Sequence, residues 1–453
     1  MIRIAGTALC ALFTVAAPRM AQAAPANVAG MSFVKSVAGI DEYRLDANGL
    51  MVLLVPDHSA PVVTFMVTYR VGSRNEVLGT TGATHLLEHL MFKGSSHYND
   101  ALGNSVKQHL GRIGGSYNAN TSLDRTAYFA EVGNENLEGY VAIEADRMRN
   151  LLLRESDRQP EMTVVRNEFE IGENDPVRAL DKEIFAAAYL AHPYHHSVIG
   201  WRSDIEKVSI EKLHAFYDTF YWPDNATVTM VGDFTADAAL ALVKKYYGSI
   251  PKAPNAIPAP YTAEPPQSGP RRVVVKRAGE LGVVGIAYKS PAASDPDLPA
   301  LDVLSNILAS GKTSRFYRAL TDKNLTLGVE AEAGFYRDPS LLQIFAYLAP
   351  GATHEQVEKT LHEELTRLLK DGVSVQEVGT ATAKLAANIA YARDGTGEVA
   401  AVLNEWISAG DWTLYSRFPQ QVSKVTAADV QRVARKYLQD DQSTTGWFVP
   451  ESK

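Results

Sequence analysis

Two histidines and a glutamate stand close together in the stretch His85-Leu86-Leu87-Glu88-His89. On an α-helix, positions 85, 88 and 89 lie within about 100° of one another and share a face. Imidazoles at i and i+4 suit zinc, which binds histidine nitrogen and carboxylate oxygen and leaves a position for water. Glu88 is then placed to take a proton from a water molecule as it attacks a carbonyl. The order is the inverse of the commoner His-Glu-x-x-His and predicts a catalytic metal site. A helix that carries these residues by chance is the alternative.

Zinc held by two histidines needs a further protein ligand, and an acidic segment downstream offers one. In a helix predicted to begin near Glu161, Glu161 and Glu168 are seven residues apart and nearly eclipsed, whereas Glu170 points about 200° away from Glu168. One of the eclipsed carboxylates can bind the metal while the other orients a ligand. A solvated acidic helix face is the alternative.

The composition is that of a globular protein with an export signal. The chain has 453 residues, 46% hydrophobic and 21% charged, enough for two domains of about 200 residues. Residues 1–23 combine a basic start, a short apolar run and Ala21-Gln22-Ala23, which predicts a signal peptide cleaved after Ala23. A membrane anchor is the alternative, but the run is too short to span a bilayer.

Cleavage at that point would also decide which groups remain for metal binding. It removes the single cysteine, Cys10, so histidines and carboxylates must hold any metal. It takes the formal charge from −8 to −10, which disfavours nucleic acid as a partner. No later stretch is apolar and long enough to cross a membrane.

The mature chain divides into two similar halves. Seven prolines between positions 251 and 270 predict an extended linker, between a metal-bearing domain at 30–250 and a related domain at 271–453. A predicted strand at 62–69 precedes the motif helix, which ends near Gly94, and a strand at 283–288 precedes a helix from Pro299 to near Gly311. Later helices at 137–153 and from Glu161 have counterparts at 357–369 and from Gln376. We therefore predict an α+β fold, duplicated, with helices packed on mainly antiparallel sheets.

The two halves carry different side chains at the positions of the metal motif. When the halves are aligned on Gly94 and Gly311, Asp302, Ser305 and Asn306 stand opposite His85, Glu88 and His89. The second half therefore lacks the metal motif, and we expect it to form a wall of a chamber.

Taken together, the motifs resemble the pitrilysin or insulinase family of zinc metallopeptidases, which includes the mitochondrial processing peptidases. The resemblance rests on His85-x-x-Glu88-His89 followed by Glu161-x-x-Val-Val-x-x-Glu168, and it covers essentially the whole mature chain. Further matching stretches are Gly-Gly-Ser-Tyr-Asn-Ala-Asn-Thr at 114–121, Glu-Ala-Asp-Arg-Met at 144–148, His-Pro-Tyr at 192–194 and Tyr-Trp-Pro-Asp-Asn at 221–225.

The resemblance implies roles for single residues. It implies that His85, His89 and Glu168 bind one Zn²⁺ per chain, that Glu88 is the general base and that Glu161 is a supporting carboxylate. It also implies that an edge strand binds an extended peptide through main-chain hydrogen bonds. That strand comprises Ser116, Tyr117, Asn118, Ala119, Asn120 and Thr121. An ordinary edge strand is the alternative. A second cluster, His192, His195 and His196, we interpret as a structural turn.

One family feature is missing. Members usually carry an Arg and a Tyr seven residues apart in the second half, where the pair binds substrate and stabilises the oxyanion. Here Thr321 and Gly328 occupy those positions. We therefore expect a homologous partner subunit that supplies the pair, as in two-subunit bacterial and mitochondrial forms. The alternative is a self-sufficient homodimer in which Arg315, Tyr317 or Arg318 substitutes.

These observations predict an exported, periplasmic zinc endopeptidase that forms half of a clamshell chamber and cleaves peptides or unfolded segments. A non-catalytic peptide-binding or structural member of the family is the other class of function. Manganese or cobalt could replace zinc, since both accept histidine and carboxylate ligands.

Overall fold

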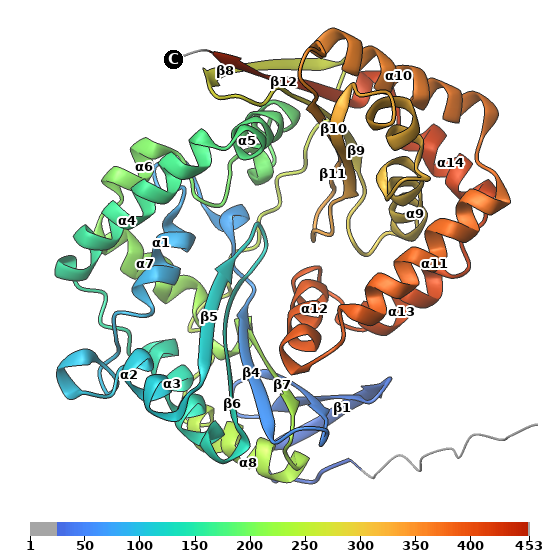
Figure 1. Cartoon of the computed structure of the whole chain (residues 1–453). Coiled ribbons are helices and arrows are strands. Elements are labelled where there is room, and N and C mark those ends of the chain that lie inside the picture. The colour runs from blue at the N-terminus through green and yellow to red at the C-terminus, as the bar shows by residue number, and fades with distance from the viewer. Residues whose placement is uncertain (1–24, 452–453) are drawn as a thin grey trace, which may run out of the picture.

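The computed structural model describes residues 25–451, so the predicted export signal lies outside the described part of the chain. Two β-sheets, each accompanied by helices, make up two domains (Figure 1). Within residues 25–451, no helix combines the length and the apolar character needed to cross a membrane.

The first sheet has seven strands in the order β1-β2-β3-β7-β4-β6-β5, and every neighbouring pair is antiparallel except β3 and β7. The strands are β1 (Met31–Val37), β2 (Ile40–Leu45), β3 (Met51–Pro56), β4 (Val62–Tyr69), β5 (Ser116–Thr121), β6 (Thr126–Gly133) and β7 (Ala226–Gly232). The accompanying helices are α1 (Ala83–Leu90), α2 (Val106–Ile113), α3 (Leu137–Arg149), α4 (Glu155–Asn174), α5 (Pro176–Ala188), α6 (Arg202–Lys207), α7 (Ile210–Phe220) and α8 (Ala236–Tyr247).

The second sheet has five strands in the order β10-β11-β9-β12-β8, and its one parallel pair is β12 with β8. The strands are β8 (Arg271–Ala278), β9 (Val283–Ser290), β10 (Thr326–Ala333), β11 (Ser340–Leu348) and β12 (Ser443–Glu451). The helices are α9 (Leu298–Ala309), α10 (His354–Asp371), α11 (Val375–Tyr391), α12 (Thr396–Ser408), α13 (Leu414–Val422) and α14 (Ala427–Tyr437).

The two sheets share one topology. The order β8-β12-β9-β11-β10 repeats β3-β7-β4-β6-β5, with the parallel pair at the same place, and β1 and β2 extend the first sheet alone. In sequence, α1 follows β4 as α9 follows β9, and α4 and α5 follow α3 as α11 and α12 follow α10. The predicted α+β class with two homologous, mainly antiparallel domains is confirmed.

Several predicted element boundaries differ from those observed. The strand at 62–69 is found as predicted, but the helix expected to begin near Glu161 begins at Glu155 and runs through Pro160. Glu155 accepts hydrogen bonds from Arg158 and Gln159, which stabilises the turn ahead of the proline. The helix predicted to reach residue 153 ends at Arg149. Residues 251–270 contain neither helix nor strand.

One helix of each domain packs against the sheet of the other domain. Leu180 and Ile184 of α5 pack with Val275, Val283 and Phe448 in the second sheet, and Ala400 of α12 packs with Met66, Ala127 and Val231 in the first. Figure 1 shows α5 beside β8 and β12, and α12 beside β4 and β7.

Two glycines allow α5 to lie close to the second sheet. A Cβ on Gly285 would lie 2.6 Å from Ile184 Cδ1, and one on Gly446 would lie 2.8 Å from Leu180 Cδ1. The exchanged helices therefore join the two domains through tightly packed apolar contacts.

Candidate metal centre and active site

Helix α1 presents the His-x-x-Glu-His motif from a fixed position in the first domain. Leu86, Leu87 and Leu90 are buried in the core, which orients the opposite face of the helix toward the site. The Glu76 carboxylate accepts hydrogen bonds from the backbone N–H groups of Gly82 and Thr84, at 2.8 and 2.7 Å. These groups lack helical partners at the start of a helix, so Glu76 caps α1 and holds the turn that carries His85.

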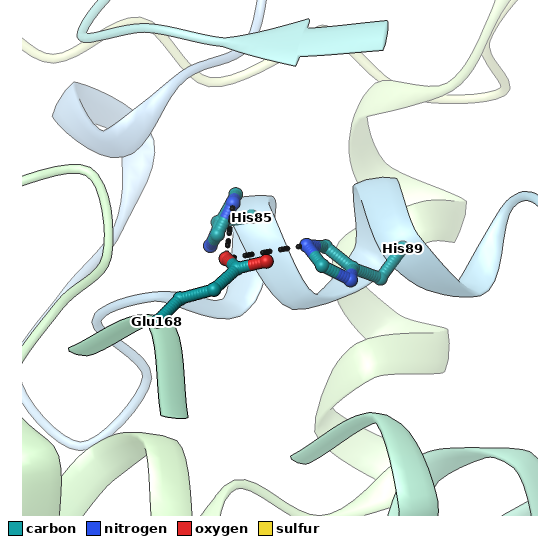
Figure 2. A group of neighbouring side chains, drawn as sticks. All are labelled: His85, His89 and Glu168. Carbon is teal, nitrogen blue, oxygen red and sulfur yellow. Dashed lines mark ion pairs between the residues drawn. The ribbon is translucent and has the colours of Figure 1, made fainter. Parts of the chain in front are cut away.

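The three predicted metal ligands converge. His85 Nε2 and His89 Nε2 lie 3.6 and 3.7 Å from the same Glu168 carboxylate oxygen, and one ligand atom from each residue lies within 4.8 Å of the others. Figure 2 shows the carboxylate of Glu168, which α4 supplies, directed between the two imidazole rings from α1. Among the described residues this is the one group of three or more side chains arranged to hold a metal ion.

Glu161 fixes one of these ligands from behind. Its carboxylate accepts a hydrogen bond from His89 Nδ1 at 3.0 Å and also binds the Lys93 ammonium. Burial would raise the pKa of Glu161, but the hydrogen bonds from Lys93 and His89 outweigh burial and hold that pKa below its usual value. A carboxylate bound to Nδ1 leaves the Nε2 lone pair of His89 free to bind a metal.

The donor set fits zinc. Two imidazole nitrogens and a carboxylate oxygen are the ligands of a catalytic zinc site that keeps a fourth position for water. Burial, followed by the neighbouring His89, lowers the pKa of His85 to about 4, so the ring is neutral near pH 7, the form that binds metal. His85 Nδ1 is buried and has no hydrogen-bond partner within residues 25–451.

Glu88 lies beside the metal ligands, on the same helical face. Its carboxylate accepts a hydrogen bond of 2.6 Å from the Thr121 hydroxyl, at the end of β5. Burial raises the pKa of Glu88, and the nearby Glu168 adds to this, while Thr121 and His89 oppose it. A carboxylate with a raised pKa next to a metal site is suited to accept and return a proton.

The three candidate ligands line one cavity of about 930 Å³ together with Glu88, Lys93, Thr121 and Glu161. The residues that line it lie between positions 85 and 199, hence in the first domain, and include Asn118 to Thr121 of β5. Strand β5 is an edge strand, paired with β6 alone among the described strands. Its Ser116, Asn118 and Asn120 are exposed, and its alternate residues are partly buried. The free backbone edge of β5 is therefore open to an added strand.

Comparisons with known proteins agree with this geometry. A family profile described as Insulinase (Peptidase family M16) matches residues 51–201, and one described as Peptidase M16 inactive domain matches residues 207–385. Over 408 residues the chain is 33% identical to the zinc protease PqqE of Helicobacter pylori, covering 89% of this chain and 91% of that protein. The chain belongs to the insulinase family of peptidases.

Solved structures share the insulinase-family fold. A protease from Helicobacter pylori matches with a TM-score of 0.85 and 33% identity, covering 91% of this chain and 99% of that chain. The periplasmic protease PqqL from Escherichia coli matches with a TM-score of 0.74 and 18% identity, covering 93% of this chain and 48% of that chain. The resemblance predicted from the motifs is confirmed.

The second domain of this insulinase-family chain carries no equivalent metal site among its described residues. Asp302, Ser305 and Asn306 lie on α9, the counterpart of α1, which fits a profile described as inactive. The Thr321 hydroxyl lies within hydrogen-bond distance of the Thr326 hydroxyl and Gly328 lies in β10, and neither residue lines the cavity beside the candidate metal ligands.

The three candidate substitutes for the missing pair also lie away from that cavity. Arg315 is bound by the Glu377 carboxylate and the Gly372 carbonyl, so its guanidinium is already used. Arg318 is exposed and Tyr317 is partly buried.

The histidine cluster at 192–196 forms a turn, as predicted. His192 Nδ1 accepts from the Tyr194 N–H and its Nε2 lies 3.1 Å from Asp338, while His195 and His196 contact backbone carbonyls through Nδ1. His192 thereby joins the first domain to the second.

Sequence reasoning missed two supporting residues. Lys93 lies beyond the end of α1, so helical spacing from His89 does not indicate its contact with Glu161. Glu76 lies in an irregular segment before α1, and nothing in its local sequence indicates that it caps that helix.

Proposed function

We propose that this chain is a zinc-dependent endopeptidase that hydrolyses peptides or unfolded polypeptide segments. The observation that carries the proposal is the convergence of His85, His89 and Glu168 beside Glu88 on the wall of an open cavity. Bound there, zinc would polarise the scissile carbonyl and lower the pKa of a water molecule.

The residues of the chain then divide the remaining work. Glu88 accepts the proton of the attacking water and returns it to the leaving amine, as its raised pKa allows. The Thr121 hydroxyl holds the Glu88 carboxylate at the end of β5, close to where a bound peptide would pass. Glu161 and Lys93 act as positioning residues for His89.

A peptide substrate would add to the sheet along β5. Main-chain hydrogen bonds to the free edge read backbone rather than side chains, so we expect broad sequence preference, with access to an enclosed chamber selecting substrates. The exposed Asn118 and Asn120 line the cavity along that edge.

The experiment is cleavage of an internally quenched peptide by the wild type and by Glu88→Gln, with zinc content measured for both. We expect equal zinc content and a rate at least about 10²-fold lower in Glu88→Gln, because a general base is lost while the ligands remain. Equal rates would reject the enzymatic reading. Peptide binding without cleavage by the zinc-loaded wild type would favour a non-catalytic peptide-binding member.

We propose further that a homologous subunit completes the site. The cavity is lined by the first domain alone, and Thr321 and Gly328 replace the Arg and Tyr that would stabilise the oxyanion. This chain matches about half of the Escherichia coli protease, so a second subunit of similar size would supply the other half of a clamshell chamber. Loss of an oxyanion donor costs about 10² to 10³ in rate, and the partner would restore it.

The partner proposal is tested by assaying the purified chain alone and then with a homologous subunit that retains the Arg and Tyr. We expect activity to rise about 10²-fold on mixing. Full activity of the lone chain would reject the heterodimer, and Arg318→Ala in the lone chain would then test the homodimer alternative.

We propose that the chain acts after export, in the periplasm, because residues 1–23 have the pattern of a cleaved signal. Cell fractionation checks this: the protein should appear in the periplasmic fraction with Ala24 as its first residue. Retention of residues 1–23 on the isolated protein would contradict it.

A further inference from the structure

The second domain has a cavity at the place equivalent to the catalytic one. It has a volume of about 650 Å³ and is lined from α9, the end of β10, α11 and α12, together with α13. These elements correspond in order and topology to α1, β5, α4 and α5, which line the catalytic cavity. Both domains therefore have a cavity at this place, and among the described residues only the first cavity carries the group of candidate metal ligands.

The walls of this second cavity are aromatic. The rings of Phe335, Trp406 and Phe418 pack against one another with centroids 5.0 to 5.5 Å apart, and Tyr336 and Tyr415 complete the lining. Such a lining binds an aliphatic chain, and the ring faces also attract cations.

Two carboxylates in the same cavity have no partner. The carboxylates of Asp302, at the position of His85 in the duplication, and of Glu332 make no hydrogen bond or ion pair with any residue in the described range 25–451. Asp302 is partly buried; burial, and then the charge of Glu332, raises its pKa to about 7. Neither carboxylate has a positive charge beside it. A cationic ligand could supply that charge.

The other charged groups that line the cavity are already engaged. Arg393 binds the Tyr415 carbonyl, and its guanidinium lies 3.9 Å from the centre of the Tyr415 ring. Glu405 forms an ion pair with Arg125. Arg393 keeps its positive charge, and its buried Nε has no partner within residues 25–451, so the charges without an ion pair are two carboxylates and one guanidinium. Their sum is negative when both carboxylates are ionised.

We propose that this second cavity binds the cationic side chain of a lysine or arginine in the peptide substrate. The aliphatic stem would lie against Trp406 and Phe418, and the charged end would reach Asp302 and Glu332. The inference rests on the proposed peptidase function, because it takes the ligand to be a substrate side chain.

One residue connects this cavity to the catalytic one. Arg125 binds Asn120, which lines the catalytic cavity, and also Glu405, which lines the second cavity. A peptide that leaves the end of β5 therefore passes close to the second cavity. The second domain would contribute to substrate selection without taking part in hydrolysis.

The experiment measures binding, by isothermal titration calorimetry, of short alanine-rich peptides to the zinc-loaded Glu88→Gln protein, which should not cleave them. Each peptide is acetylated and amidated at its ends and carries one lysine, moved along the chain, or norleucine at the same place. We expect the best lysine peptide to bind about fivefold to tenfold more tightly than its norleucine match. Arginine against citrulline should give the same order.

Variants then locate the cation. Asp302→Asn and Glu332→Gln, made singly, should each reduce the lysine preference to about twofold or less, whereas the exposed Glu363→Gln on α10 should leave it unchanged. If one of the two single variants fails to fold, the other still tests the proposal.

Two results overturn the proposal: no lysine preference in the parent protein, or a preference that survives both substitutions and so comes from acids of the catalytic cavity. The peptidase function is tested separately, by hydrolysis of the quenched peptide by the wild type.

Discussion

His89 is oriented by a chain of charges that reaches Lys93. Glu161 accepts from His89 Nδ1 and also binds the Lys93 ammonium, so the imidazole, the carboxylate and the ammonium hold one another in place. A fixed ring offers its Nε2 to the metal without losing rotational freedom on binding. We therefore expect the Lys93 contact to affect zinc affinity although Lys93 is not among the candidate ligands.

Substitution of Lys93 tests this arrangement. Lys93→Met should lower zinc affinity by about 10- to 100-fold while leaving the thermal stability of the apo protein close to that of the wild type. Affinity is measured by competition with a chromogenic chelator. Lys93→Arg, which keeps the charge, should restore most of the affinity; equal affinity in Lys93→Met would show that Glu161 needs no second partner.

Asp302 should reduce stability in the empty protein. Its folded pKa of about 7 lies above the value of 3.8 for a free aspartate, so between these values the folded state keeps a proton that the unfolded state has lost. Stability therefore falls as pH rises from 4 through 7.

Asp302→Asn removes that cost. At pH 8 it should raise the free energy of unfolding by about 1 to 3 kcal/mol, less than the full shift implies because part of the residue reaches solvent, with no gain at pH 4. Urea unfolding at both pH values measures this. The other charged residues of the cavity, Glu332, Glu405 and Arg393, are the same in the wild type and in the variant. A gain that is the same at pH 4 and pH 8 would show that the carboxylate is not the cause.

At the level of residues, the sequence was sufficient where spacing alone sets geometry. Helical periodicity places His85, Glu88 and His89 on one face. It left open which of the eclipsed carboxylates, Glu161 or Glu168, is the ligand, and the family resemblance assigned that role to Glu168. The Thr121 contact with Glu88 and the Arg125 bridge join residues 33 and 280 positions apart, and no local pattern encodes such contacts.

Helix α1 depends on a cap that lies outside it. Glu76 binds two N–H groups at its first turn, and the N-cap residue, Gly82, has no side chain to do so. Glu76→Ala leaves these buried donors unpaired and should lower the free energy of unfolding by about 1 to 3 kcal/mol.

The Glu76 variant is compared with Glu363→Ala, an exposed carboxylate in the middle of α10, in chemical denaturation. The control should change stability by less than about 0.5 kcal/mol. If both variants unfold alike, Glu76 does not stabilise the helix. Zinc affinity should fall with the cap, since His85 lies on the capped turn.

The exchange of α5 and α12 between the domains requires small residues beneath α5. Gly285→Val places atoms where Ile184 and Phe345 already lie and should cost about 1 to 3 kcal/mol in the free energy of unfolding. Gly379→Ala, in α11 with open space around it, is the matched control and should be neutral or stabilising. No cost at Gly285 would mean that α5 can move away from the sheet.

At the level of elements, prediction from sequence succeeded for the order of strands and helices and failed for their partners. In both halves a predicted strand is followed by a helix that ends near a glycine, Gly94 or Gly311. This repeat indicated two related domains, which the shared sheet topology confirms. The packing of α5 and α12 on the sheet of the other domain could not be predicted. The apolar residues of a helix such as α5 show that one face is buried, but not which sheet buries it. The start of α4 was predicted six residues too late, because residues 155–159, where Glu155 binds Arg158, already form the first turn of the helix and Pro160 does not end it.

The whole molecule is a pair of domains joined by exchanged helices and by polar contacts. Arg74 binds Asp124 in its own domain and Asp338 in the other, and the Trp412 indole donates to Glu42 across the same boundary. With the domains fixed in this way, we expect any opening of a substrate chamber to occur between this chain and its proposed partner.

We expect one zinc ion to bind between α1 and α4. The direct measurement is the zinc content and affinity of the purified chain, compared with Glu168→Gln and with Glu170→Gln, whose carboxylate on the same helix pairs with Arg202 instead. The wild type and Glu170→Gln should each hold one zinc per chain, and Glu168→Gln should lose affinity by at least about 10-fold. Stoichiometric zinc that is unaffected by Glu168→Gln, or no zinc in the wild type, would contradict it.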